Sequence, residues 1–169
     1  MSTTQSPSTR DSRTLPKLWV GYIFAVAFFV VEVAEGISDP TAADRVTLLD
    51  VLIALGGLAY WLFCVYRMHK VLADVTNGTH PISPGQAIGN HFIPLYNLYW
   101  LFKWSNEIGN FVNSRVPSKH VARGWAGFLL LIGYLLGRVD AAISLAVIFS
   151  VGLYLTRRIR SAIEPKTSR

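Results

Sequence analysis

The sequence is poor in charged residues. Asp, Glu, Lys and Arg make up 15% of its 169 residues, against about 25% in ordinary soluble domains. Hydrophobic residues make up 51%, and the mean hydropathy is +0.37. So few charges would leave much of a soluble fold's surface apolar, whereas lipid covers the apolar faces of a membrane protein. The composition therefore argues against a soluble domain and indicates an integral membrane protein.

Cysteine is nearly absent, and the common catalytic motifs are missing. Cys64 is the single cysteine, so an intrachain disulfide is excluded, and its place in an apolar run predicts a small buried side chain. There is no Gly-rich phosphate loop, no Ser-centred nucleophile elbow and no His-Glu-x-x-His motif. None of the four histidines stands at metal-ligand spacing from another: His69, His80, His91 and His120. We expect neither an enzyme nor a cofactor or metal site.

Acidic residues are fewer than basic ones, which gives a net charge of +6. A positive charge of this size is typical either of a nucleic-acid-binding protein or of a membrane protein with basic cytoplasmic flanks. A nucleic-acid-binding protein gathers its Lys and Arg along one polar face. Here the basic residues stand just outside apolar runs, as the positive-inside rule describes for membrane proteins. We therefore expect no nucleic-acid partner.

Long apolar runs dominate what is present. They predict an all-α fold with four transmembrane helices at about residues 18–35, 48–66, 121–137 and 140–156, in a membrane domain of residues 17–160. Arg138 and Asp140 divide the last apolar block. One unbroken helix would hold both charges near mid-bilayer at roughly 2.5–3.5 kcal/mol each, so a hairpin costs less. Residues 1–16, mostly Ser, Thr, Gln and Pro, predict a disordered tail, and residues 161–169 a basic tail.

The middle segment, residues 87–104, is apolar enough for a fifth span. Four residues in its first two-thirds argue against one: Asn90, His91, Pro94 and Asn97. Further on, apolar and polar residues separate onto two faces at helical spacing, which predicts an amphipathic interfacial helix at about residues 92–114. A re-entrant segment near Pro94 is the alternative, provided that protein buries its backbone.

The positions of the basic residues favour four spans over five. With both termini in the cytoplasm, only Arg45 and Arg138 of the 16 Lys and Arg residues lie outside, which leaves 14 inside. A fifth span would leave about 6 inside and about 10 outside. We therefore expect a multi-pass protein with a cytoplasmic N-terminus and C-terminus.

Two carboxylates lie in or beside the predicted spans. Glu32 falls within the first apolar run and Asp50 at the start of the second. Ionisable groups in membranes are candidates for ion or proton sites. The simpler interpretation is that each lies within about a turn of the outer surface and reaches water. If the two approach each other, they form a cation site that faces the outer compartment.

Two further patterns suggest contacts with lipid and protein. A basic cluster after the last span is suited to anionic lipid headgroups, and it also determines topology: Arg157, Arg158 and Arg160. Gly133 and Gly137 form a Gly-x-x-x-Gly pattern that allows close helix packing, either within the chain or between copies. The partners expected are the bilayer and either a second copy of the chain or another membrane protein.

Residues 83–100 (SPGQAIGNHFIPLYNLYW) carry the most distinctive pattern. With the later apolar hairpin, they resemble small multi-pass membrane proteins of bacteria to which no function is assigned. The matching positions are Pro84, Gly85, Ala87, Gly89, Phe92, Pro94, Asn97, Tyr99 and Trp100. The resemblance implies a bacterial source and the inner membrane, and supplies no activity.

Three functions remain open from the sequence. The first is a non-enzymatic accessory, scaffold or lipid-contacting subunit that uses its cytoplasmic face, with seven residues as the candidate segment: Pro84, Gly85, His91, Pro94, Asn97, Tyr99 and Trp100. The second is an oligomeric transporter or channel that uses Glu32 and Asp50. The third, a membrane enzyme acting on lipid, requires His91, Asn97 and Glu107 to meet at one cavity.

Overall fold

The structure, a computed structural model, describes residues 15–38 and 46–164, and within these ranges every regular element is a helix. Helix α1 (Gly21–Ser38) follows a short 3-10 turn, η2 (Leu18–Val20), and α2 (Leu48–Val75) is the longest helix. A short helix, α3 (Pro84–Gly89), continues into η3 (Asn90–Phe92) and is followed by α4 (Tyr96–Arg115) and η4 (Pro117–Lys119). The chain ends in a hairpin of α5 (Trp125–Leu136) and α6 (Ala141–Ile163).

Three helices are long and apolar enough to cross a membrane: Leu18–Ser38, Leu48–Val75 and Ala141–Ile163. The 28 residues of α2 extend about 42 Å, well beyond a hydrocarbon core of about 30 Å. Helix α5 is apolar but has only 12 residues, or about 18 Å. The described residues are thus all-helical, as predicted, with three helices suited to crossing a membrane where four spans were expected, and the predicted hairpin at Arg138 and Asp140 is confirmed.

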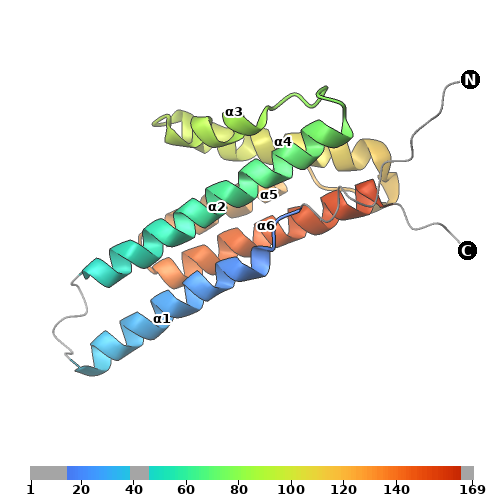
Figure 1. Cartoon of the computed structure of the whole chain (residues 1–169). Helices are drawn as coiled ribbons and strands as arrows, with labels where there is room; N and C mark the ends of the chain where they lie inside the picture. The colour runs from blue at the N-terminus through green and yellow to red at the C-terminus, as the bar shows by residue number, and fades with distance from the viewer. Residues whose placement is uncertain (1–14, 39–45, 165–169) are drawn as a thin grey trace, which may run out of the picture.

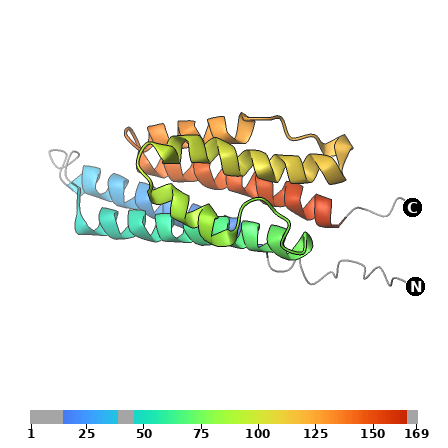
Figure 2. The ribbon, with the colours of Figure 1, turned by 90° about the horizontal axis from the view of Figure 1, so that it is seen from above.

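The helices form an elongated bundle (Figure 1). Helix α6 contacts α1, α2, α4 and α5, and is therefore the centre of the packing. Helix α3 lies on α2, and α4 covers α5 and α6 (Figure 2). The carboxyl end of α1, the amino end of α2 and the α5–α6 turn lie toward one end of the bundle, and the carboxyl end of α6 lies at the other.

The interior is filled by aromatic rings from four helices. Trp61 lies between Trp104 and Phe149, with ring centroids 6.0 and 5.8 Å away, and Tyr60 lies 6.0 Å from Phe149. Edge-to-face and tilted arrangements of this kind are favourable beyond the area that they bury. Gly21 has no room for a side chain, because the Phe149 ring occupies the space that a Cβ would take.

Apart from α5, the helices at the predicted spans extend beyond them, and part of each predicted tail is packed in the fold. The second helix continues past residue 66 because Met68, Val71 and Leu72 keep one face buried as far as Val75. The fourth continues to Ile163, into the predicted basic tail, for the same reason. At the other end of the chain, Leu15 of the predicted disordered tail packs into the core; residues 1–14 and 165–169 lie outside the described ranges.

Helix α5 begins at Trp125 and not at residue 121. Gly124 adopts a φ of +79°, a conformation that an α-helix cannot contain and that glycine adopts without strain. Polar residues of α4 hold the preceding loop: Asn106 accepts a hydrogen bond from the Gly124 amide (2.7 Å), and Asn113 accepts one from the Val121 amide (2.7 Å) and donates one to the Val121 carbonyl (3.0 Å). The polar face of α4 is therefore partly used inside the protein.

The amphipathic pattern of α4 is confirmed, but its apolar face meets protein. Leu101, Trp104, Ile108, Phe111 and Val112 are all buried in the bundle. Packing against neighbouring helices therefore accounts for the pattern, and amphipathicity alone no longer argues that this helix lies on the membrane surface.

Gly133 and Gly137 of the Gly-x-x-x-Gly pattern are used within the chain. A Cβ on Gly133 would lie 2.9 Å from Ile148 of α6, and Ser144 of α6 donates a hydrogen bond to the Gly133 carbonyl (2.7 Å). Close packing of α5 on α6 explains the spacing.

Candidate functional site

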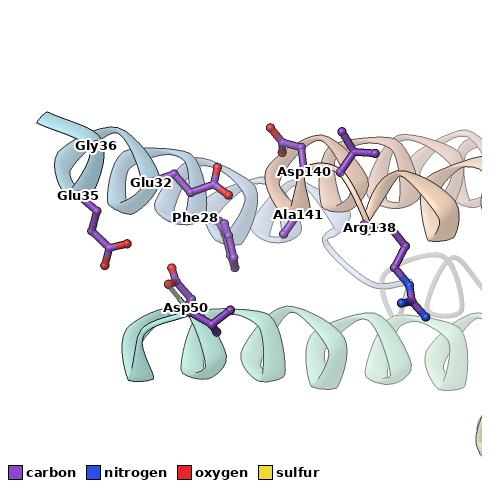
Figure 3. Close-up of a pocket in the computed structure, with 11 residues that line it drawn as sticks. Phe28, Glu32, Glu35, Gly36, Asp50, Arg138, Asp140 and Ala141 are labelled. Carbon is purple, nitrogen blue, oxygen red and sulfur yellow. The ribbon is translucent and has the colours of Figure 1, made fainter. Parts of the chain in front are cut away.

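An acidic cleft opens between α1, α2 and the α5–α6 turn (Figure 3). Its volume is about 510 Å³, within the range of about 300–1,000 Å³ that is usual for small-molecule sites. Glu32 and Asp50, the two carboxylates singled out in the sequence, both line it. The other lining residues are Phe28, Glu35, Gly36, Val46, Gly137, Arg138, Val139, Asp140 and Ala141.

Asp50 is the most constrained of the acidic residues. One carboxylate oxygen, Oδ2, accepts hydrogen bonds from the backbone amide and the hydroxyl of Thr47 (2.9 and 2.8 Å), and Thr47 Oγ1 accepts one from the Asp50 amide. This capping box begins α2 and fixes the carboxylate. The residue is only 7% exposed, and its other oxygen, Oδ1, is buried with no hydrogen-bond partner among the described residues. An unpaired buried carboxylate oxygen is costly, so Asp50 presents an acceptor that favours a cationic ligand.

The other charges of the cleft come from two further elements. Glu32 and Glu35 lie on α1; Figure 3 shows the Glu35 carboxylate in the space between α1 and α2, and the Glu32 carboxylate beside α1 on the side of the α5–α6 turn. Asp140 caps α6 by accepting a hydrogen bond from the Ile143 amide (2.7 Å), and Arg138 precedes it in the turn. With four carboxylates and one guanidinium in its lining, the cleft favours positive charge.

The cleft suits a larger cation better than a bare metal ion. Among the residues that the structure describes, no three His, Cys, Asp or Glu side chains are grouped closely enough to hold one metal. The apolar part of the lining includes the Phe28 ring, Val46 and Val139. An organic cation can reach separate carboxylates while its carbon atoms contact these side chains.

The seven residues of the candidate cytoplasmic segment form a helical hairpin, α3 to α4. Ser83 and Gln86 make a capping box that begins α3, with Pro84 and Gly85 in its first turn. The carbonyl oxygen of Ala87 then accepts hydrogen bonds from His91 Nδ1–H (2.7 Å) and Trp100 Nε1–H (3.2 Å). These two bonds tie the end of α3 to the start of α4, so His91 and Trp100 have a structural role.

The tip of this hairpin is apolar and exposed. Pro94 lies in the turn, and Leu95 adopts a φ of +62°, which is unusual for a residue with a side chain. Phe92 and Leu95 are 65% and 85% exposed, and Tyr99 is also exposed on α4. Asn97 is partly buried there, with no partner for its Oδ1 among the described residues. In Figures 1 and 2 the turn lies beside the middle of α2 and not beyond its end.

A buried histidine pair is the main polar feature that sequence reasoning missed. His69 Nδ1 and His80 Nε2 are 3.1 Å apart and share a hydrogen bond, and both residues are buried. The His69 ring also lies 5.9 Å from Trp104. Burial lowers the pKa of His80 below its usual value, although the nearby Glu107 carboxylate acts in the opposite direction. The two histidines are 11 positions apart, and only the turn after α2 brings them together.

The basic cluster divides into different environments at the end of α6. Arg158 is partly buried, and its guanidinium carbon lies 5.0 Å from the centre of the Tyr154 ring. Arg157 and Arg160 are exposed. Cys64 is fully buried, as predicted.

Comparisons with known proteins assign no role to the acidic cleft, the α3–α4 hairpin or the histidine pair. The sequence matches no protein-family model and no curated protein, and the fold matches no solved structure.

Proposed function

We propose that this chain is a non-enzymatic, multi-pass membrane protein that binds an organic cation in its acidic cleft. The observation that carries the proposal is Asp50, a carboxylate that is more than nine-tenths buried, fixed by its capping box, and left with one oxygen at the cleft that no described residue pairs. Glu32 supplies a second negative charge from the facing helix.

The topology in this proposal has four crossings. The carboxyl end of α1, the beginning of α2 and the α5–α6 turn all line one cleft, so they lie on the same side of the membrane. Helix α5 must then carry the chain back to that side although it is short. Local thinning and residues that reach to the interface accommodate short spans. The α3–α4 hairpin, with its exposed apolar tip, is re-entrant in this topology and does not cross.

The orientation follows from charge. Arg157, Arg158 and Arg160 lie at the end opposite the cleft, and Lys and Arg are enriched on cytoplasmic sides. We therefore propose that the cleft faces outward and that both termini are cytoplasmic, in the inner membrane of a bacterium, as the resemblance of residues 83–100 implies.

Two observations favour a binding protein over a channel or an enzyme. The aromatic layer of Trp61, Phe149 and Trp104 fills the bundle interior beyond the cleft, so one copy offers no polar path onward. Glu107 pairs with Lys103 (2.8 Å) and His91 donates its Nδ1–H to the Ala87 carbonyl, so two of the three groups that a lipid enzyme would need are engaged within the fold. Part of the polar face of α4 is not open to a partner, because Asn106 and Asn113 hold an internal loop.

The proposal is tested by cation binding to the full chain in nanodiscs, with tetraphenylphosphonium as the probe. We expect saturable binding that weakens at least about tenfold in Asp50→Asn, because the substitution removes the charge while its amide oxygen still accepts from Thr47. Glu32→Gln should weaken binding in the same direction. Thermal melting of each variant shows whether the fold is retained.

Asp74→Asn is the matched control. Asp74 is an exposed carboxylate on the same helix, paired with Lys70 (3.4 Å), and it does not line the cleft. Its substitution should leave the affinity unchanged. Equal affinity in Asp50→Asn, Asp74→Asn and the wild type, or no saturable binding at all, would overturn the proposal.

A further inference from the structure

A second groove, of about 440 Å³, lies between α5 and α6. Its walls are apolar along most of its length, with Leu129 from α5 and Val147 and Val151 from α6. Ile143 and Trp125, also in its lining, are about half exposed, so the groove opens on the outside of the bundle. Both helices are apolar segments of a membrane protein, and lipid is the medium that such a surface meets.

One end of the groove is aromatic and basic. Trp125 and Tyr154 line it there, at the first residue of α5 and late in α6. Arg158 follows Tyr154 by one helical turn, and its guanidinium carbon lies 5.0 Å from the Tyr154 ring centre. This cation–π contact holds the positive charge at the end of the groove, and within the described ranges the guanidinium makes no ion pair that would compete with a second partner at its planar edge.

We propose that this groove binds one phospholipid with an anionic headgroup, its acyl chain lying between α5 and α6 and its phosphate on Arg158. The order of the groups along the groove matches that of the lipid: an apolar channel, then two aromatic side chains of the kind found at the headgroup level, then a guanidinium. The site uses the membrane placement in the proposed function but not the acidic cleft. Failure of either site therefore leaves the other untouched.

The two halves of the site are tested by separate variants. Arg158→Gln removes the charge, and Ala146→Phe fills the groove, because Ala146 lines it. The controls are Arg160→Gln, an exposed arginine roughly 200° further around α6, and Ala34→Phe, which adds the same ring to an exposed position of α1. Thermal melting shows that each variant is folded.

The measurement is native mass spectrometry of the full chain released from nanodiscs of phosphatidylcholine and phosphatidylglycerol with identical acyl chains. We expect one retained phosphatidylglycerol, bound about fivefold more weakly in Arg158→Gln and unchanged in Arg160→Gln. Ala146→Phe should also lose the lipid, and Ala34→Phe should keep it. An equal loss in both arginine variants, or equal retention of phosphatidylcholine, would overturn the proposal. Competition by free glycerol phosphate would do so as well, because it would reveal a phosphate site that needs no acyl chain.

Discussion

His69 and His80 share a 3.1 Å hydrogen bond between ring nitrogens in the protein interior. The bond joins α2 to the connection that leads into α3, and both rings are buried there. It requires at least one neutral ring, because two imidazolium groups have only donors. The stability of this region should therefore depend on pH.

We expect the melting temperature to fall as the pH decreases below 6.5. Burial lowers the pKa of His80, with Glu107 opposing it, so below pH 6.5 the unfolded chain takes up a proton that the folded chain resists. The stabilisation is complete above 6.5 and is lost as the pH falls toward the lowered value. Differential scanning fluorimetry in detergent from pH 7.5 to pH 5 should show this slope in the wild type and a shallower one in His80→Gln. His120→Gln, at an exposed position, is the control and should keep the wild-type slope.

Asn113 should be the main anchor of the loop before α5. Its side chain makes two hydrogen bonds to the backbone of Val121. Asn113→Leu should lower the free energy of unfolding by about 1–3 kcal/mol in SDS titrations and make residues 116–124 more sensitive to protease. Asn110→Leu should change neither, because within the described ranges the Asn110 side chain makes only an exposed 3.4 Å hydrogen bond to Glu107. Similar losses in both variants would contradict this role.

Gly127 should tolerate no side chain. A Cβ there would lie 2.7 Å from the Cα of Phe102, a backbone atom that cannot turn away as a side chain does. Gly127→Val should cost about 1–3 kcal/mol by overpacking α5 against α4, measured by the same titration. Gly89→Ala is the comparison, because nothing lies within 4 Å of a Cβ at that position. A neutral Gly127→Val would mean that α4 and α5 are not in close contact.

Cysteine labelling should distinguish a re-entrant hairpin from an interfacial helix. A cysteine at Leu95, on the exposed tip, should resist a membrane-impermeant maleimide applied from either side, because the proposed re-entrant arrangement puts the tip in lipid. A cysteine at Asn110, at an exposed position of α4, should react from the cytoplasmic side only. Cys64 is fully buried and should not contribute. Rapid labelling at position 95 from the cytoplasmic side would place the tip in water and remove the re-entrant arrangement.

Local sequence patterns predicted where the helices lie better than they predicted what each helix face contacts. The apolar runs located α1, α2, α5 and α6, and Arg138 with Asp140 located the hairpin, because charge and hydropathy act at short range along the chain. The apolar face of α4 was also legible, but whether lipid or protein covers it depends on the placement of other helices. The sequence therefore could not distinguish an interfacial helix from a packed one.

The candidate sites were likewise predictable in their individual residues but not in how those residues come together. Glu32 and Asp50 were identifiable as unusual carboxylates, and the capping pattern of Thr47 and Asp50 was present in the sequence. That Glu35, Asp140 and Arg138 complete the cleft follows only from bringing the α5–α6 turn beside α1. The histidine pair was equally hidden, because two residues 11 positions apart in one helix lie about 16 Å apart along its axis, and only the turn after α2 brings the two rings together.

Helix α2 runs without a break from Asp50 in its first turn to His69, about 29 Å away. Between them stand Gly56 and Gly57, a pair at which helices often bend. Here Phe24 of α1 and Leu145 of α6 occupy the space beside these glycines. In the proposed orientation, the cleft and the histidine pair thus lie at opposite ends of one continuous helix, and the cytoplasmic end of α2 is the place to look for a response to a ligand bound at Asp50.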